Sequence, residues 1–537
     1  MAFFDARSSD ASQMHADLCI VGAGAAGIAL AREFIGSGLR VVLIESGDFK
    51  YRHRTQFLYL GRNTGRRNFS TVFSRFRVFG GSTTRWGGQC RPLDPIDFER
   101  REAIAYSGWP FDFAHIEPFY RRAQVVCNLG PYDYDPAAWS AERRRSLRFA
   151  DAPLAPRVYQ FSYPADFSEA YRHELERAAD VHVHLNANLV EIVLQDDANQ
   201  VRHLDLATLN GRRVSLHAKA YVLACGGIEN VRLLLASNRV ANTGIGNAHD
   251  LVGRFFMDHP YFFPGYFEPG SPDFNVDDFV IQDYASVGRE QRAHLALSLD
   301  EETRRREGLN GAALYFVRRD KYKTLPEYMS RGGLALNHLI EVLRHRESPG
   351  SELVTDFADL LGGFGDAAKT LGRQLGSLAR RDLVSGIRVA LEMTPCRDSR
   401  VALNDRKDRF GMPRVDVDWQ LNDRDRQGFY RLMEVLRREF SRLELGEFVT
   451  HEQVDESGWP LAMTGGKHHM GTTRMHTDPG QGVVDADCRV HGVGNLFIAG
   501  SSVFPTGGYA NPTLTIVALA IRLADHLRSA FKAGSLA

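Results

Sequence analysis

The chain has 537 residues, of which 44% are hydrophobic and 25% charged, a balance typical of a globular protein with at least two domains. Lys+Arg and Asp+Glu each number 66, so the formal net charge is zero. This argues against a broad nucleic-acid-binding or anionic-membrane surface, although it leaves a local basic patch open. The six scattered cysteines contain no CxxC pair and predict neither a metal site nor a disulfide framework.

The N-terminal stretch MAFFDARSSDASQMH lacks a basic region followed by an apolar one, the pattern of an export signal. No window of the sequence is apolar for long enough to span a bilayer. We therefore expect a cytoplasmic protein without a membrane span, in a compartment that keeps its thiols reduced.

The first predicted elements are a strand, a glycine-rich turn, a helix and a second strand. Leu18–Val21 is a short apolar run, followed by GAGAAG, a helical stretch, and RVVLIE ending at Glu45. In such a motif Gly22 makes the tight turn, Gly24 lets the backbone approach a pyrophosphate, and Gly27 lets the helix pack on the strand. The free N–H groups at the helix start suit phosphate.

A glycine-rich turn in an unrelated α/β protein is the alternative interpretation of this motif. The strand–helix–strand context and the position of the acid favour dinucleotide binding instead. Glu45 is placed to accept hydrogen bonds from both ribose hydroxyls of an adenosine, and its charge disfavours the 2′-phosphate of NADP. The motif alone does not choose between FAD and NAD.

The middle of the chain changes character. Residues 51–79 read as irregular, and Gly80–Glu99 (GGSTTRWGGQCRPLDPIDFE) is a glycine-dense run that allows close backbone approach to a ligand or forms a surface loop. Residues 181–193 predict a strand entering a turn, and Ala218–Asn238 predicts a strand, a glycine turn and a helix. Asp366–Leu383 is a basic amphipathic helix, which we interpret as a solvated surface helix rather than as a partner or membrane contact.

Near the C-terminus the pattern of the first motif returns. NLFIAG predicts an apolar strand, followed by a glycine turn and a long helix that begins at about Pro512. Asn511 then lies just before the helix, where a side chain can cap it. The two ends of the chain are therefore expected to build one domain, with the middle inserted.

In this order, GAGAAG with Glu45, GGSTTRWGG, VGRFFMDHP, HHMGTTRM and NLFIAGSSVFPTGGYANPTLTIVALA resemble the glucose–methanol–choline (GMC) oxidoreductases. The ANPTLT segment is most similar to the pyranose-oxidase-like and bacterial sugar dehydrogenase branch. The resemblance covers roughly half of the chain and is weak across residues 265–450.

The resemblance implies binding of FAD and oxidation of an alcohol, often a sugar hydroxyl, to a carbonyl, with hydride transfer to flavin N5. It places the catalytic His at His468 and its partner at Asn511. Histidine is also the usual base for a hydroxyl proton, and an Asn amide can orient a hydroxyl. The alternative for His468 is a structural histidine in a polar turn. His469 is expected to face elsewhere if the segment is extended.

Both lines of reasoning predict the residues that contact FAD. They are Gly22, Gly24, Ala25, Ala26, Gly27, Glu45, Ser46, Arg77, Gly80, Gly81, Ser82, Arg85, Trp86, Gly87, Gly88, Val190, Ala224, Gly226, Glu229, Gly500, Ser501, Asn511, Pro512 and Thr513.

The expected fold is α/β: a Rossmann-like FAD-binding domain from residues 1–100, 176–260 and 456–537, and a substrate-binding domain from residues 101–175 and 261–455 with an antiparallel sheet and helices.

Arg85 stands where pyranose-oxidase-like members carry the His that bonds covalently to FAD, so we expect noncovalent FAD. The aromatic residues Phe262, Phe263, Tyr266 and Phe267 either stack on a sugar or, for most of them, form core.

Three enzymatic functions remain open in principle; a non-enzymatic flavoprotein ranks last, because it would leave His468 and Asn511 without a task. The leading one is an FAD-dependent alcohol or sugar oxidoreductase whose electron acceptor is oxygen, a quinone or a redox protein. The resemblance also covers hydroxynitrile lyases and, ranked low because residues 260–450 lack a long apolar run, light-driven fatty-acid decarboxylases. A homo-oligomer is compatible with the sequence.

Overall fold

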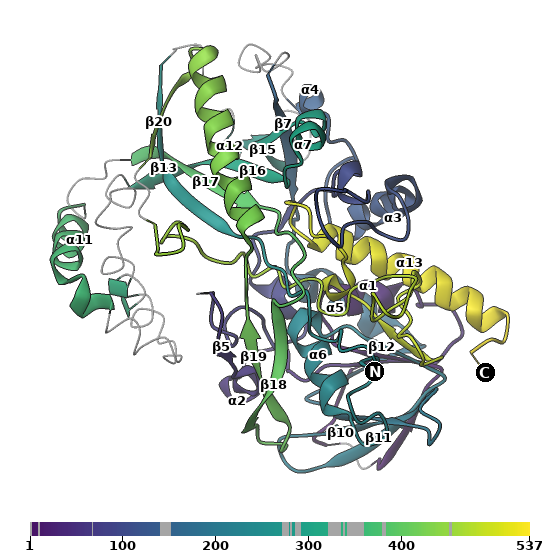
Figure 1. Cartoon of the computed structure of the whole chain (residues 1–537). Helices are drawn as coiled ribbons and strands as arrows, with labels where there is room; N and C mark the ends of the chain where they lie inside the picture. The colour runs from purple at the N-terminus through teal and green to yellow at the C-terminus, as the bar shows by residue number, and fades with distance from the viewer. Residues whose placement is uncertain are drawn as a thin grey trace.

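In the computed structural model of the chain, the described residues are 3–8, 11–66, 68–139, 152–270, 276, 279, 282–284, 291–320, 335–336, 339–340, 359–377, 383–450 and 454–536. Two large sheets organise them, a parallel one near the two termini and an antiparallel one at the far end of the molecule (Figure 1). This confirms the predicted α/β class.

The parallel sheet has six strands in the order β1 (Phe3–Asp5), β8 (Val181–Leu185), β4 (Val41–Ile44), β3 (Leu18–Val21), β12 (Ala220–Leu223) and β21 (Leu496–Ile498). All neighbouring pairs are parallel. Strands β4, β3, β12 and β21 are buried along their whole length, as expected when both faces of a parallel sheet are covered. Helices α1 (Ala25–Arg32) and α13 (Thr513–Lys532) pack together beside it, which brings the two chain ends into one unit.

Smaller elements surround this sheet. Strands β2 (Gln13–His15), β11 (Arg213–His217), β10 (Val201–Ala207) and β9 (Asn188–Leu194) form a second sheet. Strands β18 (Arg400–Lys407), β19 (Pro413–Asp418) and β5 (Arg62–Asn63) form a third sheet, which packs on α6 (Gly226–Ala236). Short helices include α2 (His53–Gln56), η1 (Phe57–Tyr59), η2 (Gly81–Thr84), η3 (Pro95–Asp97), α5 (Phe167–Arg177) and η7 (Ser501–Val503).

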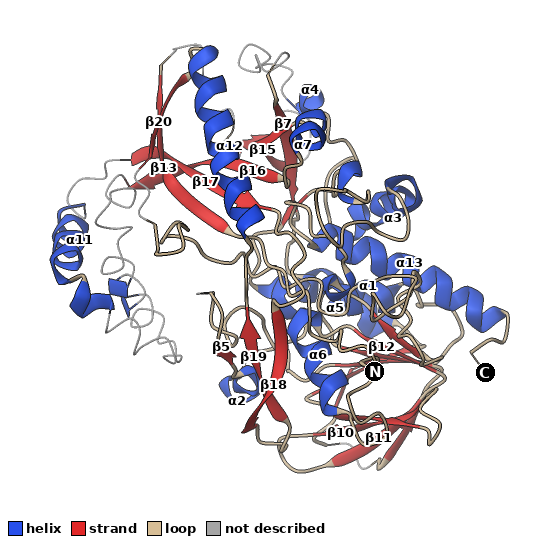
Figure 2. Cartoon of the chain, in the orientation of Figure 1, coloured by secondary structure: helices blue, strands red, loops and turns tan. Residues whose placement is uncertain are grey.

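The antiparallel sheet runs β20 (Gly446–Thr450), β13 (Tyr261–Pro269), β17 (Leu383–Leu391), β16 (Ala312–Asp320), β15 (Gln291–Leu299), β7 (Leu154–Phe161) and β6 (Gln89–Cys90), with β14 (Gln282–Tyr284) beside β15. One face packs against the long helix α12 (Asp423–Arg442), as Figure 2 shows, through a core that includes Phe262, Phe267 and Phe429. The other face turns Tyr159, Tyr261 and Tyr315 away from that core.

Four further helices complete the described chain. They are α3 (Phe113–Val126), α4 (Pro136–Trp139), α7 (Glu301–Glu307) and α11 (Phe364–Ser377). Helix α3 packs on α13, and its Tyr120 shares the core of the parallel sheet. The domain boundaries that the sequence suggested remain a prediction. Helix α11 occupies most of the predicted basic helix, whose last residues from 378 to 382 lie outside the described part.

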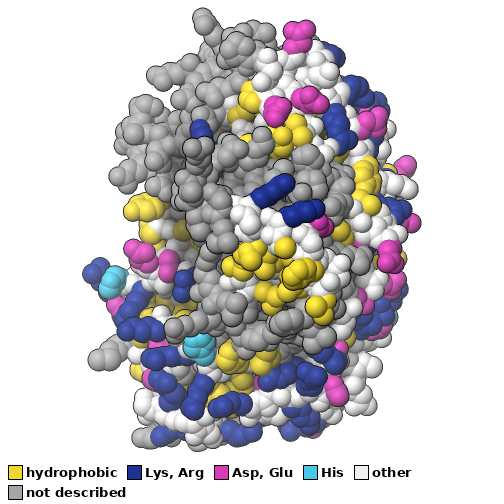
Figure 3. Space-filling model, turned by 90° about the vertical axis from the view of Figure 1, so that its left-hand side faces the viewer, with side chains coloured by type: hydrophobic (Ala, Val, Ile, Leu, Met, Phe, Trp, Pro, Cys, Tyr) yellow, Lys and Arg dark blue, Asp and Glu magenta, His cyan; other side chains and the backbone are white. Residues whose placement is uncertain are grey.

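Figure 3 shows the face on the left of Figure 1, where many Lys and Arg side chains gather in the lower part and charged side chains of both signs lie along the right edge. Among the helices that the structure describes, none combines the length and apolar character needed to cross a bilayer.

The turn between β3 and α1 depends on close backbone packing. A Cβ added at Gly27 would lie 1.8 Å from the carbonyl oxygen of Gly22, and one added at Gly22 would lie 2.6 Å from that of Ala224. Backbone atoms cannot move aside as a flexible side chain does. Gly27 therefore fixes the contact between helix and strand that the sequence motif predicts.

We expect Gly27→Ala to lower the free energy of unfolding by at least the ~1–3 kcal/mol typical of overpacking. The matched control is Gly428→Ala on α12, where an added Cβ meets nothing within 4 Å and a helical Ala is favoured by roughly 0.5–1 kcal/mol. Urea unfolding of both variants measures the difference. Equal stability of the two would contradict the close-packed turn.

Candidate active site

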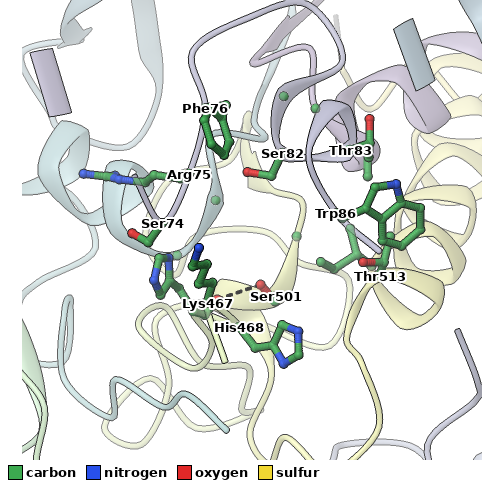
Figure 4. Close-up of a pocket in the computed structure, with 18 of the residues that line it drawn as sticks. Ser74, Arg75, Phe76, Ser82, Thr83, Trp86, Lys467, His468, Ser501 and Thr513 are labelled. Atoms are coloured by element: carbon green, nitrogen blue, oxygen red, sulfur yellow. Dashed lines mark hydrogen bonds between the residues drawn. The ribbon is translucent and has the colours of Figure 1, made fainter. Parts of the chain in front are cut away.

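A cavity of about 670 Å³ lies between the two large sheets. Its walls come from the glycine turn before α1, residues 74–89, the start of α6, strands β13 and β17, the segment 464–469 and the turn before α13. In Figure 4 the labelled residues from the N-terminal loop, such as Phe76 and Trp86, stand opposite His468 and Ser501 from the C-terminal part. The cavity thus joins segments that are hundreds of residues apart in sequence.

One end of the cavity fits the ADP half of FAD. A Cβ added at Gly24 would meet nothing within 4 Å, so the backbone there is open to the cavity. Gly24 is also the residue before α1 and provides no side-chain cap, which leaves the first N–H groups of the helix available to phosphate.

Glu45 lies at the same end, at the carboxyl end of β4. Its Oε2 accepts from the N–H of Ala23 at 2.9 Å, and Oε1 accepts from the N–H of Gly47 at 2.7 Å. Burial raises the pKa of Glu45 from its ordinary value, and these backbone donors oppose the rise. A carboxylate has about four acceptor positions, so capacity remains for a ribose hydroxyl.

Most predicted FAD contacts line this cavity. Those that do are Gly22, Gly24, Ala25, Ala26, Glu45, Ser46, Arg77, Gly81, Ser82, Arg85, Trp86, Gly87, Ala224, Gly226, Glu229, Gly500, Ser501, Asn511, Pro512 and Thr513. Gly27, Gly80, Gly88 and Val190 are not among the described residues of its wall. Gly27 packs inside the turn, and Leu189 rather than Val190 reaches the cavity.

Arg77 and Glu229 are held mainly by each other. Glu229 is buried and pairs with Arg77, with Arg75 at 3.3 Å and with Arg232 at 3.1 Å. Burial acts to raise the pKa of Glu229, but the guanidinium groups of Arg77, Arg232 and Arg75 lower it to about 2. This cluster fixes α6 against the loop at residues 74–77.

The two predicted catalytic residues meet. Nδ2 of Asn511 lies 3.4 Å from Nε2 of His468, while Nδ1 of His468 lies 2.9 Å from Nδ1 of His259. The rings of His259 and His468 are nearly perpendicular, with centroids 4.9 Å apart. His468 is therefore contacted at both ring nitrogens, and His259 is a third member that the sequence analysis did not assign.

All three histidines of this region favour the neutral form. Burial, with the nearby His259, His469 and Arg388, holds the pKa of His468 well below 6.5. Burial lowers the pKa of His259 to about 4 and that of His469 to about 3. At neutral pH the cavity thus contains imidazoles that can accept a proton.

A buried carboxylate positions this group. Oδ1 of Asp258 accepts from the backbone N–H of His468 at 2.8 Å, of Gly466 at 2.9 Å and of His259 at 2.8 Å. Its Oδ2 accepts from the N–H of Lys467 at 3.2 Å. Burial raises the pKa of Asp258 to about 6 against these donors, so the carboxylate prevails at pH 7.

The backbone beside His468 is strained. Lys467 has φ 62°, the left-handed region that a long side chain rarely adopts. Such strain persists where the surroundings impose it, often at functional sites. Here the Asp258 bonds and the bridge between Met257 and Met470 impose it.

One expectation about a side chain is corrected. Asn511 does not cap α13, because Pro512 is the N-cap residue and no side-chain cap bond forms. His469, next to His468 in the chain, is also among the residues that line the cavity. Its ring centroid is 5.7 Å from that of Phe256, and its carbonyl accepts from Oγ of Ser501 at 2.7 Å (dashed line in Figure 4).

The sequence analysis left other residues of the site unassigned. His259, which contacts His468, lies in the quoted motif VGRFFMDHP, where a polar pair inside an apolar run was the available signal. Tyr261 and Phe263 lie at alternate positions of β13 and line the cavity; Phe263 was one of the aromatic residues expected to stack on a sugar or form core, whereas Tyr261 was not assigned. Arg388 comes from β17, where the resemblance is weak and no motif marks it.

Sequence comparisons relate this chain to known oxidoreductases. The profile of FAD dependent oxidoreductases matches residues 17–240, and that of the GMC oxidoreductase C-terminal part matches residues 395–520. The chain is 26% identical to 6'''-hydroxyparomomycin C oxidase of Streptomyces lividus, over 95% of this chain and 92% of that protein. It is 39% identical to C-glycoside 3-oxidase of Arthrobacter globiformis, over 25% of this chain and 26% of that protein.

Among solved structures, formate oxidase superposes with a TM-score of 0.57 at 14% sequence identity, covering 98% of this chain and 100% of that one. That similarity concerns the fold. Both profiles include residues that line the cavity. The first includes Gly24 and Glu45, and the second includes His468 and Asn511. The chain is an FAD-dependent oxidoreductase whose C-terminal part matches the GMC oxidoreductases.

Proposed function

We propose that this protein oxidises a hydroxyl group of a small alcohol or sugar to a carbonyl, with His468 as the base and FAD held noncovalently. The observation that carries the proposal is the contact between His468 Nε2 and Asn511 Nδ2 inside the cavity that the glycine turn also lines. When bound, FAD supplies the hydride acceptor. The lyase alternative is not favoured, because both profiles and the relatives above describe oxidoreductases.

The contacts of His468 support one arrangement of its protons. Two neutral nitrogens 2.9 Å apart must share one proton, so one of His468 Nδ1 and His259 Nδ1 donates to the other. If His468 donates, its Nε2 carries the lone pair and faces Asn511, whose amide is a donor. This tautomer leaves a free base on the cavity side.

In the proposed reaction, Nε2 of His468 takes the hydroxyl proton of the substrate as hydride leaves the carbon. The imidazolium that forms keeps its Nδ1–H bond to His259. Asn511 then has two tasks. Nδ2 donates toward the oxygen that gains negative charge, and Oδ1, buried without a hydrogen-bond partner, accepts from a further substrate hydroxyl.

The substrate class rests on the relatives. Their names describe oxidation of an aminoglycoside and of a C-glycoside, and a sugar ring offers the neighbouring hydroxyls that Asn511 can bind. We propose a sugar, glycoside or other alcohol as substrate and oxygen, a quinone or a redox protein as acceptor. Anaerobic reduction followed by oxygen, with peroxide measured, separates an oxidase from a dehydrogenase.

His468→Ala should keep its FAD and its fold, yet reduce the flavin about 10²–10⁴-fold more slowly than the wild type, the usual contribution of a general base. His469→Ala is the matched control, since it removes the adjacent ring from the same cavity wall. Anaerobic stopped-flow absorbance measures both. If His469→Ala reduced the flavin slowly and His468→Ala reduced it at the wild-type rate, the base would be assigned to the wrong residue.

The pH profile tests the His259 contact. Because the pKa of His468 is held well below 6.5, flavin reduction should stay constant from pH 8 to pH 6 and fall only at lower pH. His259→Leu removes the Nδ1 acceptor and a group that lowers this pKa, so the acid limb should move to higher pH and the rate should fall by less than His468→Ala costs. His259→Asn, which keeps an acceptor, should restore part of the rate. An unchanged profile in His259→Leu would refute the proposed tautomer.

Noncovalent attachment follows from Arg85, because a guanidinium at this position of the glycine-rich loop is no nucleophile at neutral pH. Acid precipitation should therefore release free FAD into the supernatant, while the precipitated protein keeps the mass of the polypeptide. Mass spectrometry of the pellet checks this, and a protein mass increased by that of FAD would contradict it.

A further inference from the structure

Arg388 is a charged residue of the cavity wall whose charge is not balanced by an acidic residue in the described part of the chain. It lies near the middle of β17, is partly buried, and lines the cavity together with His468. Among the described residues it forms no ion pair, and its Nε is buried without a hydrogen-bond partner. Burying a cation without a counter-charge is costly, so such a residue calls for a reason.

Its neighbours hold it in place without neutralising it. The guanidinium carbon lies 4.6 Å from the ring centroid of Tyr315 and 5.3 Å from that of Tyr261. Tyr315 is the register partner of Arg388 on β16, and Tyr261 comes from β13 on the other side of β17. The two rings offer cation–π attraction, which offsets part of the cost of burial but leaves the N–H donors of the fork to be satisfied.

The carboxylates of the cavity wall are occupied elsewhere. Glu45 and Glu229 are the acidic residues among the described lining. Glu45 accepts from backbone N–H groups at the ADP end, and Glu229 is bound by three arginines. Neither is available to Arg388. Its charge instead acts on histidines, because it contributes to the lowered pKa of His468 and of His294.

Further polar side chains lie near Arg388 on the same face of the sheet. His294 is buried on β15 with Nδ1 unpaired, and its ring centroid lies 5.2 Å from that of Tyr315. Its Nε2 lies 3.3 Å from Nε2 of Gln89, which lines the cavity. A ligand at Arg388 would therefore meet a cation, aromatic faces and an amide, and the carboxylates among the described residues of the cavity wall are bound elsewhere.

We propose that Arg388 binds an anionic oxygen group of the substrate, a carboxylate or a phosphate, so that the preferred substrates are acidic alcohols or acidic sugars. This rests on the proposed function above and narrows its substrate class. A guanidinium binds either group with two parallel N–H···O bonds, so it fixes the position of the substrate as well as attracting it. The hydroxyl to be oxidised would then be held toward His468.

The first test is direct binding to the FAD-loaded protein by isothermal titration calorimetry. The probes are D-glucuronate, D-glucose 6-phosphate, acetate and inorganic phosphate, with D-glucuronamide as the neutral counterpart of glucuronate. We expect at least one sugar anion to bind about 10–100-fold more tightly than glucuronamide, the range of a charged hydrogen bond. Which of the two sugar anions prevails distinguishes carboxylate from phosphate. Arg388→Gln should remove the preference.

Arg437→Gln is the matched control. Arg437 is exposed on α12, on the other side of the same sheet, and its loss changes the net charge equally without touching the cavity. It should keep the anion preference. If none of the four anions binds the wild type more tightly than it binds Arg388→Gln, the inference is overturned, whatever the enzyme oxidises.

Turnover at pH 8, where His468 is neutral in every variant, provides the second test. Arg388→Gln should raise KM for the preferred anion about 10–100-fold and should affect KM and the reduction rate with a neutral sugar much less. An equal loss with neutral and anionic substrates would overturn the inference and assign Arg388 to the chemical step. If no sugar reduces the flavin while the anion preference in binding persists, the proposed function fails and the anion site stands.

Discussion

The carboxylate of Asp258 is the interaction on which the site depends. It accepts hydrogen bonds from the backbone of Gly466, Lys467 and His468 and also from the N–H of His259. One buried group therefore sets the positions of both imidazoles, although they are 209 residues apart in the chain. Without it, the strained backbone at Lys467 would relax and the Nδ1–Nδ1 contact would have no fixed distance.

The same anchoring limits the freedom of the imidazole rings. An isolated imidazole exchanges its two tautomers freely, whereas His468 is contacted at one nitrogen by His259 and at the other by Asn511. Residues beside the parallel sheet, such as Gly24 and Glu45, line one part of the cavity, and Tyr261 and Arg388 of the antiparallel sheet line another. Residues 464–470 connect the two parts, because Thr464 bridges to Tyr261 of β13 and Met470 bridges to Met257 in the core.

The sequence predicts the parts of this site that rest on local patterns. The apolar strands Leu18–Val21 and Val41–Ile44, the glycine turn between them and Glu45 are readable because their spacing is imposed by close backbone packing. The pairing of His468 with Asn511 came from the resemblance, and the structure brings the two into contact.

Other features could not be found this way. The polar pair Asp258 and His259 stands out in the sequence, but the contact of His259 with His468 joins residues far apart in the chain, and no local pattern predicts it. Arg388 likewise approaches His468 only through the long-range pairing of β17. The cap expected at Asn511 failed because Pro512 takes the N-cap position and Asn511 lies one residue further out. Val190 was placed at the cavity although Leu189 takes that position, a shift of one residue in an alternating strand.

The alternation of the antiparallel sheet has a consequence for how substrate preference can diverge. On β17, Ile387, Val389 and Leu391 belong to the core under α12, whereas Arg388 and Ala390 face the opposite side. Substitutions that retune selectivity are thus confined to every second position, and the intervening ones are constrained by packing. A one-residue shift of register would bury the guanidinium in the core and expose Val389. Insertions within these strands would therefore disrupt the core, whereas substitutions at positions 388 and 390 would leave it intact.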